Sequence, residues 1–377
     1  MSLKVSLLKK IDSLAGAAAV RLLSAPQPKK EIPEIFKNIL IIRPGGIGDA
    51  ALLIPAVRAL RQRFPAARIT VLAERRNSAV FQLYPEIDCT LQYDHSSDLF
   101  KTIFGSYDLV IDTEQWHRLS AVVARLTSAP FSIGFATNER SRMFTHPVAY
   151  SNDDYELDSF FNLLAPLGLE SFQTPERFLS LPATATAKAL KLLEPIGKKQ
   201  FVALFPGASI PERRWGADKF RLVAELLLAF KISTVVVGGE EDRESGNGIV
   251  AGGAGLNLAG MTSLAETAAV IDKSALLISG DSGVLHLAVG LDKPTVSLFG
   301  PGRAKKWAPR GESHIVINKG LPCSPCTTFG TTPPCRVDGQ CMKEISVDEV
   351  FNAVAILLTS TGVLPSSCCK RDWIEVA

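Results

Sequence analysis

The chain has 377 residues, of which 46% are hydrophobic and 21% charged, and its formal net charge is +3. This length exceeds one ordinary core, so we expect a globular protein of two domains. The small net charge argues against a nucleic-acid partner, and no apolar run is long enough to cross a bilayer.

Residues 1–32 form a basic segment whose apolar residues recur at helical spacing. The apolar positions are Leu7, Leu8, Ile11, Leu14, Ala15, Ala18 and Leu22, and the basic ones are Lys4, Lys9, Lys10, Arg21, Lys29 and Lys30. Such an amphipathic helix either lies on an anionic membrane surface or packs on its own protein, and both alternatives stay open. Asp12 interrupts the apolar stretch, so we do not expect a secretory signal.

After Pro33 the chain alternates between short apolar strands and amphipathic helices. We expect strands at 38–42, 68–73, around Cys89, at 109–112 and at 131–135, with helices at 49–64, at 77–84 and from about residue 117. Alternation of this kind builds a parallel sheet covered by helices. The prediction is an α/β chain whose first doubly wound, Rossmann-like domain spans residues 33–185.

The alternation begins again after a stretch rich in Pro and Thr at 171–186. We expect strands at 201–205, 233–237, 275–279 and 294–299, and helices at 217–230 and 264–273. This predicts a second Rossmann-like domain at 186–360, with a loop rich in cysteine at 323–341, and a tail at 361–377. Because such sheets bind ligands at the carboxyl ends of their strands, we expect the site in a cleft between the domains.

A glycine-rich turn, from Arg43 to Asp49, follows the first strand and opens a helix. Gly46 and Gly48 allow close approach of a ligand to the backbone, which makes them candidate acceptor or loop contacts. The turn lacks the Gly-Lys-Ser/Thr ending of a phosphate loop and the spacing of a dinucleotide fingerprint. Asp49 either caps the helix or acts as a catalytic carboxylate. Taken with the motifs of the second domain, the catalytic role is favoured.

The most informative motif is Gly280-Asp-Ser-Gly-Val-Leu-His286, between two apolar strands. It places backbone N–H groups of Ser282, Gly283 and Val284 at a helix N-terminus, where unpaired donors and the helix dipole favour an anion. Gly283 has no Cβ, so a phosphate can come close. His286 lies one turn further and is either packed or a ligand contact. The motif indicates a phosphorylated ligand.

Two more loops of the second domain carry polar residues. The loop from Phe205 to Ser209 continues to Arg213, Arg214 and Trp215. Two arginines beside a Gly- and Ser-containing loop suit a pyrophosphate, and the alternative is a solvated basic loop anchored by the tryptophan. Asp242 follows the next strand. It is a candidate ribose contact, or an acid favoured by a helix dipole.

Together these elements resemble the family nine glycosyltransferases, the ADP-heptose:lipopolysaccharide heptosyltransferases. The matching segments, in family order, are Ile41–Pro55, Phe205–Ser209, Arg213–Phe220, Val235–Glu244, Asn257–Leu264 and Ile278–Pro301. The resemblance implies a GT-B fold, with two Rossmann-like doubly wound domains facing a central cleft. It also implies an inverting, metal-independent transfer of a heptose from ADP-heptose to the lipopolysaccharide inner core.

The resemblance assigns roles to single residues. Asp49 falls on the family's proposed general base. The donor-binding positions are Ser209, Arg214, Asp242, Asp281, Ser282, Gly283 and His286. It further implies an ADP-sugar donor, a lipid-linked oligosaccharide acceptor and a cytoplasmic enzyme peripheral to the inner membrane. Alternatives are a related transferase using another nucleotide-sugar for surface polysaccharide, and a non-catalytic sugar-nucleotide-binding protein associated with membranes.

Four of the seven cysteines lie in one loop, namely Cys323, Cys326, Cys335 and Cys341. Their number and the spacing of the first pair are those of a Cys₄ zinc site, although the second pair is more widely spaced. A cytosolic enzyme disfavours disulfides. A structural zinc ion or reduced thiols are therefore the favoured alternatives, and no metal is expected to be required for catalysis.

Overall fold

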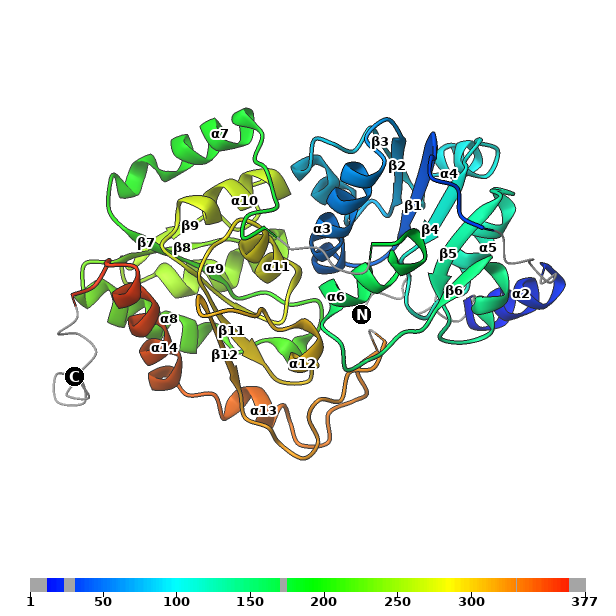
Figure 1. The fold of residues 1–377 in the computed structure, drawn as a ribbon. Coiled ribbons are helices and arrows are strands. Elements are labelled where there is room, and N and C mark those ends of the chain that lie inside the picture. Colours follow the sequence, from blue (N-terminus) through cyan, green and yellow to red (C-terminus); the bar gives the residue numbers. More distant parts are fainter. Residues whose placement is uncertain (1–11, 24–30, 170–174, 330, 366–377) are drawn as a thin grey trace. The chain divides into compact units, whose positions relative to one another are not determined.

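The structure is a computed structural model that describes residues 12–23, 31–169, 175–329 and 331–365. The chain divides into two compact units, Met1–Ser180 and Leu181–Ala377. Each unit is an α/β domain built on a six-stranded sheet (Figure 1). The division falls inside the Pro- and Thr-rich stretch after which a second domain was expected. The cleft between the domains stays a prediction.

The first domain has a parallel sheet in the order β3-β2-β1-β4-β5-β6. Its strands are β1 (Asn38–Arg43), β2 (Arg68–Ala73), β3 (Cys89–Gln92), β4 (Leu109–Asp112), β5 (Phe131–Phe135) and β6 (His146–Val148). This is the strand order of a doubly wound dinucleotide-binding sheet, in which the direction of winding reverses between β1 and β4.

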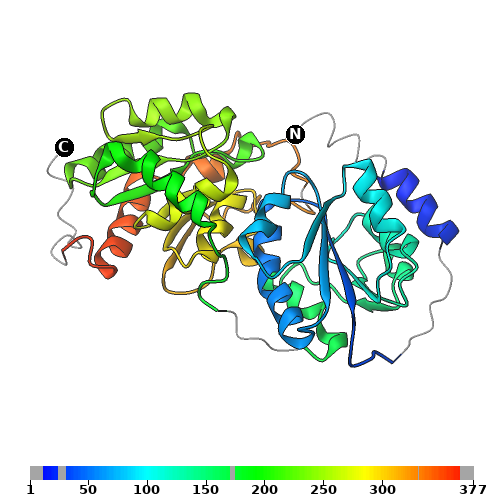
Figure 2. The same ribbon diagram turned by 90° about the horizontal axis from the view of Figure 1, so that it is seen from above.

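Helices cover both faces of this sheet. They are η1 (Asp12–Gly16), α2 (Ala17–Leu23), α3 (Ile47–Arg63), η2 (Ser78–Leu83), α4 (Ser96–Ile103), α5 (Leu119–Leu126), η3 (Glu139–Met143), α6 (Glu156–Asn162) and η4 (Ala165–Leu167). Helices α3 and α6 pack on one face, and α2, α4 and α5 on the other (Figures 1 and 2). Because both faces are covered, Ile39 to Ile42 of β1 are all buried.

The described part of the N-terminal segment packs against this domain. Val20 of α2 is buried in the apolar cluster of the sheet. The carboxylate of Asp12 accepts hydrogen bonds from the backbone N–H groups of Arg118 (2.7 Å) and Leu119 (2.8 Å), at the start of α5. Leu22 is 86% exposed. The described part of the segment thus packs on this domain at Asp12 and Val20, and its docking on a membrane stays a prediction.

Some predicted features lie outside the described residues: Lys4, Leu7, Leu8, Lys9, Lys10, Ile11, Lys29, Lys30 and the end of the C-terminal tail from residue 366. No helix in the part of the chain that the structure describes is long and apolar enough to cross a membrane.

The second domain repeats the arrangement of the first. Its parallel sheet has the order β12-β11-β10-β7-β8-β9. The strands are β7 (Phe201–Phe205), β8 (Ser233–Val236), β9 (Gly255–Asn257), β10 (Leu277–Gly280), β11 (Thr295–Phe299) and β12 (His314–Asn318). Read from β9, the order matches that of the first sheet, with the reversal between β7 and β10.

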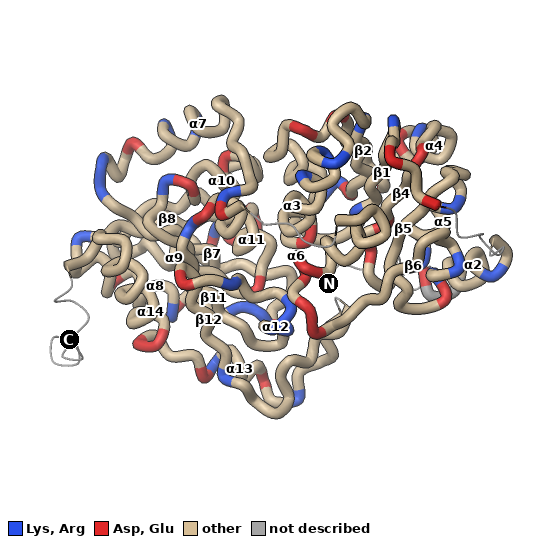
Figure 3. Tube along the Cα trace, in the orientation of Figure 1, with Lys and Arg blue, Asp and Glu red and all other residues tan. Residues whose placement is uncertain are grey.

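The helices of the second domain again form two layers. They are α7 (Ala183–Leu193), η5 (Glu194–Ile196), η6 (Pro211–Arg213), α8 (Ala217–Ala229), η7 (Glu240–Asp242), α9 (Arg243–Val250), α10 (Leu264–Lys273), α11 (Gly283–Gly290), α12 (Ala304–Trp307), α13 (Gln340–Lys343) and α14 (Val347–Ser360). Helices α8 and α14 lie on one side of the sheet, and α7 and α10 on the other (Figure 1). Basic and acidic residues are interspersed in both domains (Figure 3).

Most predicted strands are confirmed, several with the same bounds. The helix predicted at 77–84 is a 3₁₀ helix, η2, because the segment is short and ends before Pro85. The strands β6, β9 and β12 were not predicted. Each lies at the edge of its sheet and is only partly buried. β6 and β9 lack a continuous apolar run, whereas β12 has one, Ile315 to Ile317, that the sequence-based prediction missed.

Candidate functional site

Both predicted motifs lie where the strand order of their own sheet reverses. In the first domain, the turn from Arg43 to Asp49 follows β1, and residues 112–117 follow β4. In the second domain, the loop at 205–214 follows β7 and the turn at 280–286 follows β10. Doubly wound sheets bind ligands at the carboxyl ends of strands at this position. Each domain therefore presents one candidate half-site.

The turn after β1 sets Asp49 in the first turn of α3. Gly45 has a φ of 113°, a conformation that favours glycine. Gly46 is the N-cap of α3 and has no side chain to cap the helix. The carboxylate of Asp49 instead accepts a hydrogen bond from the N–H of Gly46. Its side chain is 21% exposed, so the same carboxylate caps the helix and stays accessible from outside.

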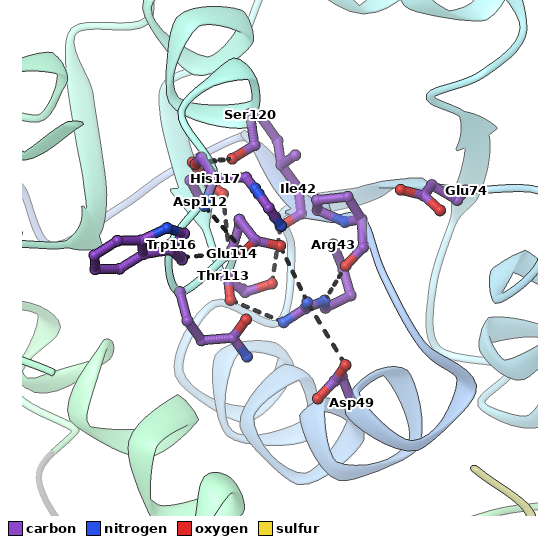
Figure 4. A network of polar contacts seen from close by, with 12 residues as sticks. Ile42, Arg43, Asp49, Glu74, Asp112, Thr113, Glu114, Trp116, His117 and Ser120 are labelled. Atoms are coloured by element: carbon purple, nitrogen blue, oxygen red, sulfur yellow. Dashed lines mark hydrogen bonds and ion pairs between the residues drawn. The ribbon is translucent and has the colours of Figure 1, made fainter. Parts of the chain in front are cut away.

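Arg43 is buried beside Asp49 and is fixed by several groups (Figure 4). Its Nη2 lies 3.8 Å from Oδ2 of Asp49 and 3.5 Å from Oε2 of Glu114. Its Nε donates to the carbonyl of Pro44 (2.6 Å), and its Nη1 donates to the carbonyl of Thr113 (2.9 Å). One guanidinium thus lies within ion-pair distance of two carboxylates. One follows β1 and the other follows the neighbouring strand β4.

Glu114 is also buried and held in place. It accepts hydrogen bonds from the backbone N–H groups of Trp116 (3.1 Å) and His117 (3.2 Å) (Figure 4). Burial favours its neutral form, but Arg43, His117 and Arg140 together hold the pKa of Glu114 below its usual value. Glu114 is therefore a carboxylate anion at neutral pH.

The pKa of Asp49 moves the other way. Burial raises the pKa of Asp49, Arg43 opposes that rise, and the negative charge of Glu114 adds to it. The Gly46 N–H and Arg76 lower it less, so that the pKa of Asp49 is raised overall. A carboxylate with a raised pKa takes a proton more readily, which suits a general base.

A second buried ion pair, between Arg140 and Asp112, lies next to the network of Arg43, Asp49 and Glu114. Nη2 of Arg140 lies 2.5 Å from Oδ2 of Asp112, and Ser120 donates to the same oxygen at 2.9 Å. Arg140 also donates to the carbonyls of Glu114 and Phe135. The pair therefore ties the loop after β4 to the end of β5. Sequence reasoning assigned a role in the site to Asp49 but none to Arg43 or Asp112, although acids directly after an apolar strand were an available signal.

In the second domain, Ser282 caps α11. Its Oγ accepts a hydrogen bond from the N–H of Leu285 (3.2 Å) and lies 2.8 Å from Oγ of Ser279. Gly283 is the first residue of the helix, and both Ser282 and Gly283 are only partly buried. The predicted N-terminal turn is thus formed and reachable, as an anion site requires.

The structure separates the two adjacent arginines of the second domain. Nη1 of Arg213 lies 3.1 Å from Oδ2 of the buried Asp281. Arg214 is exposed and lines a pocket of about 430 Å³ together with residues of the cysteine loop. The arginine beside the predicted donor motif is therefore Arg213, which the sequence-based assignment passed over in favour of Arg214. Their order along the chain alone could not distinguish them.

His286 is buried next to Asp281. Its ring lies edge-on to Trp307, with centroids 6.4 Å apart. Burial lowers the pKa of His286 to about 4, with Asp281 opposing, so the ring is neutral at pH 7. Nδ1 of His286 and Nε of Arg213 lack hydrogen-bond partners among the described residues, and Oδ2 of Asp281 has the ion pair with Arg213 but no further hydrogen bond. Since buried polar atoms are normally paired, the two unpaired nitrogens indicate a place for a polar ligand.

Asp242 is buried and its carboxylate accepts a hydrogen bond from the N–H of Gly239 (3.1 Å). It fills the space beside Gly207 and Gly238, where an added Cβ would approach its oxygens within 2.6 and 2.7 Å. Burial raises its pKa. Asp242 therefore hydrogen-bonds to the turn after β8 and packs against Gly207 in the loop after β7. Its contact with a ribose stays a prediction. Ser209 is exposed in the loop after β7.

The four clustered cysteines are free thiols of unequal exposure. Cys323 and Cys335 are exposed, Cys326 is half-buried and Cys341 is buried. Burial and the neighbouring thiols raise the pKa values of Cys326 and Cys341. Within the described residues, no group of three or more His, Cys, Asp or Glu side chains could hold a metal ion. The structural zinc ion considered from the sequence stays a prediction.

Three comparisons relate the chain to known proteins. The family model described as glycosyltransferase family 9 (heptosyltransferase) matches residues 97–335. Lipopolysaccharide heptosyltransferase 3 of Escherichia coli K12 is 28% identical over 292 residues, which cover 71% of this chain and 84% of that protein. The sequence similarity thus extends over most of both chains.

Solved structures show the same fold. E. coli ADP-heptose lps heptosyltransferase II matches with a TM-score of 0.71 and 21% identity, over 86% of this chain and 99% of that one. A family 9 glycosyl transferase from Veillonella parvula matches with a TM-score of 0.72 and 21% identity, over 88% and 99%. These likenesses confirm the predicted fold class of two parallel α/β domains, the GT-B fold.

Proposed function

The chain belongs to glycosyltransferase family 9, and on that premise we propose that it transfers a heptose from ADP-heptose to the inner core of a lipopolysaccharide. Relatives named as lipopolysaccharide heptosyltransferases support the substrate class. The observation that carries the proposal is Asp49. Its accessible carboxylate has a raised pKa and stands at the carboxyl end of β1, in the segment that resembles the family's general-base motif.

In the proposed reaction, a hydroxyl of the acceptor attacks C1 of the donor heptose while Asp49 takes the hydroxyl proton. A new C–O bond forms as the bond from C1 to the pyrophosphate oxygen breaks, and ADP leaves with the electron pair. Attack on the face opposite ADP inverts the anomeric centre. A positioned general base contributes about 10²- to 10⁴-fold to such a step.

The second domain supplies the groups for the leaving ADP. The N-terminus of α11, with Ser282 and Gly283, offers backbone donors to a phosphate. Arg213 or Arg214 adds a cationic fork for the other oxygens. These fixed donors stabilise the charge that develops on the pyrophosphate, so we propose that catalysis needs no metal ion.

The acceptor is proposed to be a lipid-linked oligosaccharide, so the enzyme works at a membrane surface. The basic N-terminal segment and the exposed Leu22 support docking on anionic lipid. Deleting residues 1–11 should lower co-sedimentation with vesicles of anionic lipid while leaving transfer to a soluble acceptor unchanged. Unchanged co-sedimentation would assign the segment to packing alone.

The proposal is tested by calorimetry with ADP-heptose, ADP, UDP and a UDP-sugar, with a chelator present. Selective binding of ADP-heptose and ADP is expected. Preference for a uridine nucleotide would instead establish the second candidate, a related transferase that uses another nucleotide-sugar. Binding that depends on a divalent metal would contradict the metal-independent mechanism.

A further inference from the structure

The buried charges around Asp49 are arranged so that one cation is divided between two anions. Arg43 is held by the carbonyls of Pro44 and Thr113, which fixes its guanidinium regardless of either carboxylate. Nη2 of Arg43 lies slightly closer to Glu114 than to Asp49, at 3.5 Å against 3.8 Å. Asp49 therefore does not have the cation to itself.

The other groups near Asp49 do not supply a second strong cationic partner for its carboxylate. Arg76, from the loop after β2, lowers the pKa of Asp49 only as the least of the causes. Tyr150 also faces Asp49, and a phenol carries no charge near neutral pH. Glu156 of α6 adds a further negative charge near Arg43 and accepts a hydrogen bond from Tyr150 at 3.1 Å. Four carboxylates, those of Asp49, Glu114, Glu156 and Asp112, thus act on the guanidinium of Arg43.

We propose that Glu114 is a positioning residue that tunes Asp49 by competing with it for Arg43. The competition leaves Asp49 basic enough to accept a proton from a sugar hydroxyl, while Arg43 still holds its carboxylate in place. Without the charge of Glu114, Arg43 would pair with Asp49 alone and make it a weaker base. The proposal rests on the proposed role of Asp49 as the general base.

Glu114→Gln is a fitting probe because a glutamine carbonyl still accepts the N–H groups of Trp116 and His117. We expect the acid limb of the pH profile of kcat/KM to move to lower pH by about one unit, and the rate on the plateau to fall several-fold. The affinity for ADP should not change. Glu114→Asp, which retains the charge, should restore most of the rate.

Glu139→Gln is the matched control, because it removes a glutamate of the same domain that pairs with Arg118 at 2.7 Å. Its pH profile should match that of the wild type. A folded Glu114→Gln variant whose acid limb and plateau equal those of the wild type would overturn the proposal. So would a Glu114→Asp variant as impaired as Glu114→Gln, because then the charge is not the cause.

A second measurement needs no turnover. Carbon-13 NMR of labelled aspartate carboxyls, assigned with Asp49→Asn, should show Asp49 titrating above its usual range in the wild type and lower in Glu114→Gln. An Asp49 resonance that titrates at or below the usual range in the wild type contradicts the tuning. If the NMR shift is present but Asp49→Asn remains fully active, the base assignment fails while the coupling to Glu114 stands.

Discussion

The two domains place different side chains on the same strand–turn–helix arrangement. After β1 and β4, the buried Arg43 lies within ion-pair distance of the half-buried Asp49 and the buried Glu114. After β10, the turn offers a serine cap, backbone donors and a neutral histidine, with one ion pair between Arg213 and Asp281. Each turn joins a parallel strand to a helix. The two sites differ in the side chains that the turns and the neighbouring strands contribute.

The difference is also one of charge balance. In the first domain, a cation divided between two carboxylates leaves Asp49 with a raised pKa, which suits proton transfer. In the second domain, burial keeps His286 uncharged, so the proposed anion site would depend on the helix terminus and on arginine. We therefore expect the first turn to affect the rate of transfer and the second to affect binding of the donor.

The largest effect should come from Asp49→Asn. Loss of the base should lower kcat by about 10²- to 10⁴-fold, because the acceptor hydroxyl then has no partner for its proton. ADP affinity should stay within about two-fold, since the donor is assigned to the other domain. Initial rates and calorimetry measure the two quantities. A variant that loses ADP affinity but retains its rate would contradict the assignment of transfer to the first turn and donor binding to the second.

Next in size is the difference between the two adjacent arginines. Arg213→Ala should weaken ADP binding about 10-fold or more, because charge-assisted hydrogen bonds to phosphate contribute on the order of 1.5–3 kcal/mol. Arg214→Ala should have the smaller effect, since Arg214 is exposed on the side of the cysteine loop. Calorimetry with ADP decides. A larger loss for Arg214→Ala would restore the assignment made from the sequence.

The neutral state of His286 predicts a pH dependence of stability. Its pKa in the folded protein, about 4, is below the ordinary value of 6.5. Because the pKa is depressed, the stability that goes with a neutral His286 is fully present above about pH 6.5. It is lost as the pH falls towards 4. The loss at pH 4 is on the order of 3 kcal/mol. Urea unfolding from pH 7 to 4 should show a smaller decline for His286→Gln, and an equal decline would contradict a buried neutral ring.

The smallest effect should come from Asp12, which caps a helix next to the site of the first domain. Asp12 caps the start of α5, directly after the loop that carries Glu114. Asp12→Ala should lower the free energy of unfolding by about 1 kcal/mol, as is usual for loss of a helix cap. Thermal unfolding measures the change, and Asp12→Asn, which retains an accepting oxygen, serves as the control. Equal stability of wild type and Asp12→Ala would show that the segment is not anchored there.

The interior of each sheet could be predicted from the sequence, because a strand buried on both faces has a continuous apolar run. Phe201–Phe205 and Leu109–Asp112 are examples with correct bounds. The short edge strands β6 and β9 could not, since they carry no such run, whereas the run from Ile315 to Ile317 in β12 was an available signal that the prediction missed. Position along the chain likewise located the turns at Asp49 and Ser282, because a small-residue turn between strand and helix is a local pattern.

Only the tertiary structure decided which charges meet. Arg43 contacts Glu114 and Thr113, and Arg140 contacts Asp112, across long separations in sequence that only the strand order closes. Arg213 and Arg214 are neighbours in the chain, yet one reaches Asp281 and the other faces the cysteine loop. Local sequence determined the backbone frame of each site. Electrostatic interactions depend on distance in space, so the pKa values and pairings within the frame were determined by the fold.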